Sequence, residues 1–163
     1  AEVSTRGVEL SIEARPLAAL RMNFDAAFID AKFDRFPRGG IAGSDATGNE
    51  LPYSPEFCGA FRASYELPFN VAGGRFGILG QYSYRSASSS GQENSRDQEM
   101  GSYDLVSARV GWTRDDGAFG IALWGENLSD ELYVTNRVRD FIGTQAISFG
   151  EPRTYGVEVR ASF

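Results

Sequence analysis

The chain has 163 residues with a formal net charge of −6, a single cysteine and no histidine. The acidic balance disfavours a nucleic-acid partner, which usually requires a basic patch, and the lack of histidine removes the usual general base of Ser and Cys hydrolases and the commonest zinc ligand. An enzyme is therefore the weakest function class, and we predict no catalytic residue, no cofactor and no metal site.

Alternation of apolar and polar residues predicts seven strands, each with one apolar and one polar face. Val8, Leu10 and Ile12, for example, alternate with Glu9 and Ser11. The predicted strands cover residues 5–15, 19–34, 56–67, 75–85, 102–113, 118–128 and 155–163. Glycine and aromatic residues are plentiful and helical stripes are hard to find, so the chain is typical of an all-β protein.

The connections between these strands alternate between short and long. Short turns are predicted at residues 16–18, 68–74 and 115–117, the last being an Asp-Asp-Gly hairpin turn. Long polar loops are predicted at residues 36–55, 86–100 and 129–151. In an up-and-down sheet all the long loops fall at one end, which is the outer-membrane barrel pattern of short periplasmic turns and long extracellular loops.

Aromatic residues of the apolar faces gather at the two ends of the predicted strands, and mainly aliphatic or small residues lie between them. The girdle expected near the short turns consists of Tyr65, Phe76, Trp112, Phe119 and Phe163. The girdle expected near the long loops consists of Phe28, Phe57, Tyr82, Tyr84, Tyr103 and Tyr155. Two aromatic girdles around an aliphatic band fit a hydrocarbon layer with wet interfaces.

Three parts of the chain, in order, resemble segments of TonB-dependent outer-membrane receptors. Residues 7–10, Gly-Val-Glu-Leu, resemble the strand that opens the C-terminal part of these barrels, and Arg15-Pro16 followed by Leu20 fits the turn after it. Residues 123–133, Leu-Trp-Gly-Glu-Asn-Leu-Ser-Asp-Glu-Leu-Tyr, resemble an "NL-x-D-x-x-Y" signature. Residues 149–157, Phe-Gly-Glu-Pro-Arg-Thr-Tyr-Gly-Val, look like the segment that leads into the last strand.

The resemblance implies an antiparallel up-and-down transmembrane β-barrel of the 22-stranded type, plugged by an N-terminal domain. Such receptors take up scarce nutrients across the outer membrane of a Gram-negative bacterium. For this chain the resemblance favours a ferric siderophore as the nutrient. We expect this chain, over residues 1–163, to supply about seven to eight C-terminal strands and their outer loops, without the plug or the TonB box. The implied partners are outer-membrane lipid, the barrel-assembly machinery, the TonB complex acting through the missing plug, and a small-molecule ligand.

Ligand selectivity is expected in the loops. In the third long loop Tyr133, Arg137, Arg139 and Phe141 offer aromatic and cationic groups to an anionic aromatic ligand such as a siderophore. The polar faces of the strands are expected to line the lumen with a lattice of ion pairs. The charged residues of that lattice are Glu9, Glu13, Arg21, Asp25, Arg62, Glu66, Arg109, Glu158 and Arg160.

The last predicted strand alternates Tyr155, Val157 and Val159 with polar residues and ends on Phe163. In the family that the chain resembles, the terminal aromatic strand is read by the barrel-assembly machinery. The resemblance therefore implies that these four residues form an assembly signal.

Two other architectures fit the same alternation. A small stand-alone outer-membrane barrel would need an even strand count, and Gln145–Phe149 could supply an eighth strand. A soluble lipocalin-like barrel would turn the apolar face inward around a ligand. The loop asymmetry, the two girdles and the terminal aromatic residue argue against the soluble barrel.

Overall fold

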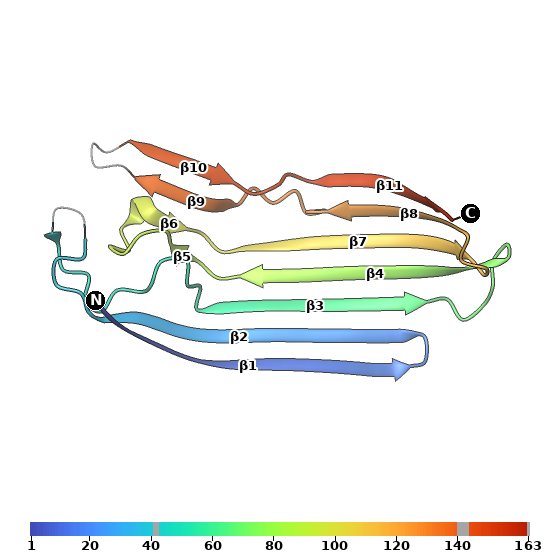
Figure 1. Cartoon of the computed structure of the whole chain (residues 1–163), viewed down its shortest axis with the longest axis horizontal. Helices are drawn as coiled ribbons and strands as arrows, with labels where there is room; N and C mark the ends of the chain where they lie inside the picture. Colours follow the sequence, from blue (N-terminus) through green and yellow to red (C-terminus); the bar gives the residue numbers. More distant parts are fainter. Residues whose placement is uncertain (41–42, 140–143, 163) are drawn as a thin grey trace.

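The computed structural model describes residues 1–40, 43–139 and 144–162. Seven strands form one antiparallel sheet in which neighbours along the predicted series are neighbours in space (Figure 1). The strands are, in order across the sheet, β1 (Glu2–Leu17), β2 (Leu20–Arg35), β3 (Phe57–Glu66), β4 (Gly74–Arg85), β7 (Tyr103–Arg114), β8 (Phe119–Glu126) and β11 (Thr154–Ala161). The predicted all-β, antiparallel, up-and-down arrangement is confirmed, and the sheet of the described residues is open, with β1 and β11 at its edges.

The long connections contain further short elements, of which only the strand at Gln145–Phe149 was anticipated from the sequence. They are β5 (Ser88–Ser89), the 3₁₀-helix η2 (Arg96–Gln98), β6 (Glu99–Met100), β9 (Val134–Arg139) and β10 (Gln145–Phe149). β10 pairs with β9 in a separate hairpin, with Ile147 opposite Arg137. The prediction that Gln145–Phe149 could supply an eighth wall strand is therefore wrong, because β11 already occupies the free edge of β8. No helix in the described ranges is long and apolar enough to cross a membrane.

The register of the sheet keeps one apolar face and one polar face across all seven strands. On the apolar face Ala108 lies opposite Gly80 and Gly125, whereas its neighbour Ser107 lies opposite Gln81. Tyr103 was assigned to an aromatic girdle of the apolar face, and this assignment is wrong. Tyr103 lies opposite Arg85 on the polar face, because it is an even number of residues from Ser107.

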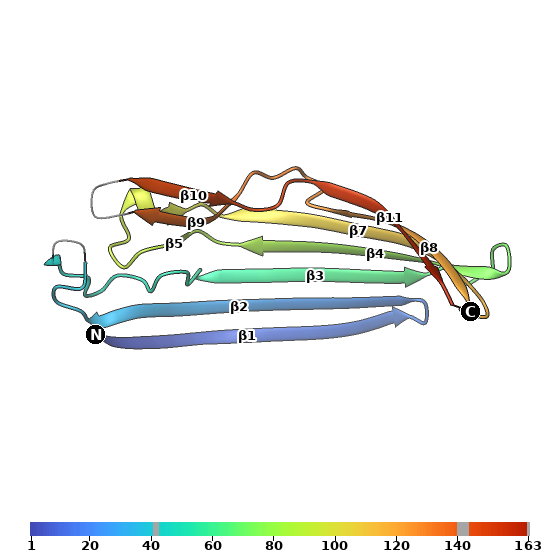
Figure 2. The same ribbon diagram turned by 45° about the horizontal axis from the view of Figure 1, so that its top comes forward.

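The apolar face is exposed along the wall. Val8, Tyr155 and Val157 have 71%, 80% and 62% of their surface exposed, and the two edge strands carry most of the larger exposures. Figure 2 shows that the sheet curves toward β8 and β11 rather than lying flat. A curved wall with an uncovered apolar face is the geometry of a barrel segment that meets lipid on its outside.

The short turns lie together at the opposite end from the long connections (Figure 1). Gly117 adopts a positive φ of 71°, as the predicted hairpin turn requires. The first turn begins two residues later than predicted and covers residues 18–19: β1 continues to Leu17, and a register irregularity between Ala14 and Leu17 accommodates Pro16. Proline is tolerated at such an irregularity because it has no N–H to give to the ladder.

Candidate functional site

The three long connections pack against one another at one end of the sheet. Several hydrogen bonds join the first connection to the second, among them Asn49 Nδ2 to Gln92 O (2.9 Å), Glu50 N to Asn94 Oδ1 (2.7 Å) and Tyr53 N to Ser89 O (2.8 Å). The apolar side chains buried at this end are those of Ala31, Phe33, Ala46 and Met100, whereas in the strands below the described residues bury only that of Ala122. The most tightly packed part of the chain is therefore its loop cluster, which we define as residues 36–40, 43–56, 86–102, 127–139 and 144–153.

The β9–β10 hairpin contacts each of the other two connections through a polar side-chain interaction. The Tyr53 hydroxyl donates to Asn136 Oδ1 at 2.6 Å. Arg139 Nη1 lies 2.6 Å from Asp97 Oδ2 on η2, with side chains that are 39% and 23% exposed. Sequence reasoning missed these contacts. The one available signal was Tyr53 itself, an aromatic residue between Pro52 and Pro55 in an otherwise polar loop.

Tyr133, the first of the predicted ligand-binding residues, lies at the base of the hairpin. Its ring stacks on Tyr103, with centroids 4.3 Å apart and an interplanar angle of 30°. The ring also lies so close to Gly150 that a Cβ there would overlap it. The aromatic ring is thus held by neighbours of its own chain, and its structural role is established by these contacts.

Arg137 and Arg139 share one face of β9 because they are two residues apart in a strand. Arg139 is neutralised by Asp97. The Nε atom of Arg137 is buried and has no hydrogen-bond partner among the described residues. At the rise of an extended strand, the Cα atoms of Tyr133 and Arg139 are about 20 Å apart. The predicted residues are therefore not gathered at one point. Phe141 lies outside the described residues.

The contact between Asp97 and Arg139 gives the loop cluster a defined response to pH. The Ser95 hydroxyl, then the backbone N–H of Asp97 and then the Arg139 guanidinium hold the pKa of Asp97 below its ordinary value. The stabilisation from the ionised carboxylate is therefore present above that ordinary value and is lost only as the pH falls through the lowered pKa. We expect the protection factors of the β9 amides, which are exchange rates corrected for the intrinsic rate at each pH, to be unchanged between pH 7 and about pH 5 and to fall in stronger acid.

Replacing Asp97 by Asn should accelerate exchange of β9 several-fold at pH 7 and remove this acid response, because the amide carries no charge. Asp45→Asn is the matched control. Asp45 also has a lowered pKa, caused by Thr47, but its bonds stay within its own loop. Equal exchange of β9 in wild type and Asp97→Asn would show that the ion pair does not hold the hairpin.

The polar face of the sheet carries part of the predicted ion-pair lattice. The pairs are Arg15–Glu13 (3.1 Å), Arg75–Glu66 (3.0 Å) and Arg109–Glu158 (2.8 Å). Glu66 and Arg75 join neighbouring strands, and Arg109 reaches across β8 to make a two-pronged contact with Glu158 on β11. All of these side chains are substantially exposed, so each pair contributes little to stability on its own.

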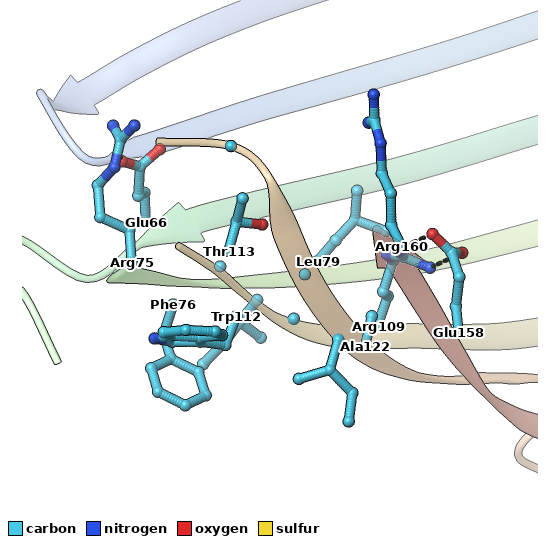
Figure 3. Close-up of a pocket in the computed structure, with 16 residues that line it drawn as sticks. Glu66, Arg75, Phe76, Leu79, Arg109, Trp112, Thr113, Ala122, Glu158 and Arg160 are labelled. Carbon is cyan, nitrogen blue, oxygen red and sulfur yellow. Dashed lines mark hydrogen bonds and ion pairs between the residues drawn. The ribbon is translucent and has the colours of Figure 1, made fainter. Parts of the chain in front are cut away.

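A hollow of about 500 Å³ opens on this face near the short turns. The hollow forms because three residues with little or no side chain, Gly77, Gly111 and Ala122, are consecutive partners across β4, β7 and β8. Figure 3 shows Arg109 and Glu158 joined at one side of the hollow, while the rings of Phe76 and Trp112 lie on the other side of the strands. The hollow is a polar recess in the wall rather than an enclosed cavity.

The described part of the predicted assembly signal points away from the polar face. Tyr155, Val157 and Val159 alternate on the apolar face of β11 and are 80%, 62% and 61% exposed. Phe163 lies outside the described residues. The three side chains leave a continuous apolar edge on the last strand of the sheet.

Comparison with protein families matches residues 1–128 to the family described as "TonB dependent receptor-like, beta-barrel". Among solved structures, the ferric yersiniabactin uptake receptor FyuA from Yersinia pestis superposes with a TM-score of 0.83 at 17% identity, covering 99% of this chain and 24% of that one. The ferric preacinetobactin receptor BauA from Acinetobacter baumannii gives a TM-score of 0.73 at 18% identity, covering 96% and 22%.

The ferric citrate transporter FecA in its unliganded form gives a TM-score of 0.70 at 19% identity, covering 95% of this chain and 24% of that one. At these identities the three likenesses concern the fold. The chain spans about a quarter of the length of each of the three structures.

Proposed function

Because the chain belongs to the TonB-dependent receptor-like β-barrel family, we propose that it forms the C-terminal barrel wall and outer loops of a receptor that takes up a ferric siderophore across the outer membrane of a Gram-negative bacterium. Lipid surrounds the apolar face, the TonB complex supplies energy through a plug domain, and the barrel-assembly machinery reads the final strand. The family match over residues 1–128 carries this proposal.

Two further observations support it. The three structural neighbours are named as an uptake receptor, a receptor and a transporter of ferric complexes, which is a statement about those proteins and suggests the ligand class here. The open sheet keeps an exposed apolar face opposite a polar face that carries ion pairs, as a wall between lipid and lumen requires.

The ligand is proposed to meet the arginine face of β9. The Arg137 side chain is partly exposed, and a guanidinium forms charge-assisted hydrogen bonds with the anionic oxygens of a ferric complex. Its Nε is buried and has no partner among the described residues, so the ligand would be met by the accessible end of the guanidinium. Tyr133, Arg139 and Phe141 remain the other proposed ligand-binding residues, with Tyr133 acting through the loop base that it holds.

Uptake of radioactive iron by cells that carry the full-length receptor tests the proposal. We expect saturable uptake of one ferric siderophore, lost when the receptor gene or the TonB gene is deleted and restored by the receptor on a plasmid. Passage of small solutes that is unchanged without TonB would instead indicate a stand-alone barrel and would overturn the proposal.

Arg137→Gln should raise the half-saturating siderophore concentration about tenfold, because one charge-assisted hydrogen bond is lost. The amount of folded receptor in the membrane should not change. Arg96→Gln is the control, since Arg96 is an exposed arginine of the neighbouring connection. An equal shift in both variants would mean that general loop charge, rather than the β9 arginine, attracts the ligand.

A further inference from the structure

The "NL-x-D-x-x-Y" segment and the segment before the last strand lie against each other at the base of the third long connection. We propose that they form a base clasp, defined as Asn127, Asp130, Glu131, Glu151 and Arg153, which sets the register of β11 on β8. The proposal concerns how the barrel wall closes around its last strand, and it holds whatever the solute is.

Asn127 is the centre of the base clasp. Its side chain is 5% exposed and spans both ends of the connection. Its amide Nδ2 donates to the carbonyl oxygens of Glu131 at 2.9 Å and Glu151 at 3.0 Å, and its Oδ1 accepts from the Glu131 N–H at 2.9 Å. The bond to Glu151 O joins the chain leaving β8 to the chain approaching β11.

A second contact of the base clasp lies beside the first. Arg153 Nη2 is 3.2 Å from Asp130 Oδ2. Asn127 and Asp130 both adopt positive φ, 48° and 59°, a conformation that Asn and Asp tolerate better than most residues. The Asp130 N–H donates to Asn127 O at 2.9 Å, which closes the tight turn that brings these side chains round to Glu151 and Arg153. The residue types of the motif are therefore explained by the turn and by the contacts it makes.

The last strand needs such a device because its ladder alone leaves the register ambiguous. β11 is an edge strand that pairs only with β8, over eight residues from Thr154↔Glu126 to Ala161↔Phe119. A slip by two residues keeps every side chain on its original face, so the alternation of the strand does not prevent it. The base clasp does, because it fixes Glu151 against Asn127 at the point where the ladder begins.

Two contacts farther along the ladder agree with the same register. Trp124 lies over Gly156, where a Cβ would come 2.8 Å from the indole ring, and Arg109 pairs with Glu158. Both of these contacts form only after β11 is in place. The base clasp differs from them because its members are close to the strand ends and can form first.

Cysteine pairs across β8 and β11 test the register in the full-length receptor, with Cys58 replaced by Ser and no other cysteine present. The bond from Ser162 N to Ala118 O places Leu123 and Val157 in a non-hydrogen-bonded pair, where Cβ atoms are close enough for a disulfide. The L123C/V157C pair reports the native register. The I121C/V157C and G125C/V157C pairs report slips of two residues.

Asn127→Ala should lower oxidative cross-linking of the native pair at least about fivefold and raise that of one slipped pair. Asn136→Ala, which removes another loop asparagine, should leave all three pairs unchanged. A native pair that cross-links equally in both variants overturns the proposal. Loss of the native pair without a slipped pair also overturns it, because the base clasp would then hold β11 without selecting its register.

Arg153→Ala keeps the test decisive if Asn127→Ala does not reach the membrane. Arg153 contributes one exposed contact and leaves the Asn127 bonds in place. We expect a twofold to threefold fall of the native pair, about what the loss of one weak contact gives, with a matching rise of a slipped pair. An unchanged native pair in a receptor that lacks Arg153 would overturn the proposal.

Discussion

Ala108→Arg in the full-length receptor should destabilise the folded barrel in a bilayer by about 2–4 kcal/mol, the cost of a guanidinium near the membrane midplane. Ala108 lies halfway along β7 on the apolar face, between Gly80 and Gly125, so no neighbouring carboxylate can pair with the new charge. Urea unfolding of the receptor refolded into lipid vesicles measures the difference. In cells the same change should sharply reduce the folded receptor in the outer membrane.

Ser107→Arg is the matched control for this prediction. Ser107 is the preceding residue of the same strand, lies opposite Gln81 and faces the polar side. We expect its free energy of unfolding to change by less than about 1 kcal/mol, because the new side chain remains in water and has polar neighbours. A larger loss for Ser107→Arg than for Ala108→Arg would mean that lipid lies on the other face.

Gly74→Ala should lower the free energy of unfolding by about 1–3 kcal/mol, because the added methyl group has no room. A Cβ on Gly74 would come 2.5 Å from the backbone oxygen of Thr113 and equally close to the indole of Trp112. The carbonyl belongs to the neighbouring strand and cannot retreat without stretching the β4–β7 ladder. Trp112 is also held, since its Nε1 donates to Val71 O at 2.8 Å.

Gly77→Ala, in the same strand, provides the control for crowding. A Cβ on Gly77 would meet no atom within 4 Å. Its free energy of unfolding should stay the same or rise by about 0.4–1 kcal/mol, since alanine restricts the unfolded chain. If both variants lose the same stability, the effect of Gly74→Ala reflects strand propensity and not the contact with Thr113.

The wall could be predicted from the sequence because its two environments alternate with the residue number. Side chains such as Ala108 and Ser107 differ in polarity because they face opposite sides, and that difference is visible without coordinates. Tyr103 shows the limit of this reasoning. It was grouped with outward aromatics by its position along the strand, whereas the strand period places it on the polar face beside Arg85.

The loop cluster could not be predicted in the same way, because its contacts join residues far apart in the chain. Tyr53 and Asn136 are 83 residues apart, and neither lies in a periodic segment. Gln145–Phe149 was recognised as a possible strand, but β9 and its pairing with β10 were missed because this connection looked polar, although Val134 and Val138 were present. Polar loops pack here through hydrogen bonds, which leave no apolar pattern in the sequence.

The base clasp lies between these two cases. The sequence identifies the motifs that contain its residues, because they resemble segments of a receptor family. Their partners could not be foreseen, because the bonds of Asn127 go to backbone carbonyls of Glu131 and Glu151, which any residue type would supply. The sequence therefore shows the side chain that makes such a contact but not the backbone group that it binds.

Spin-label accessibility along β7 of the full-length receptor in lipid vesicles tests the central claim most directly. Labels placed one at a time at residues 105–111 should alternate with a period of two: even positions accessible to oxygen dissolved in lipid, and odd positions to a water-soluble nickel complex. The opposite phase would place the apolar face inward, as in a lipocalin-like barrel. Uniform access to the water-soluble complex would also contradict a membrane-spanning wall.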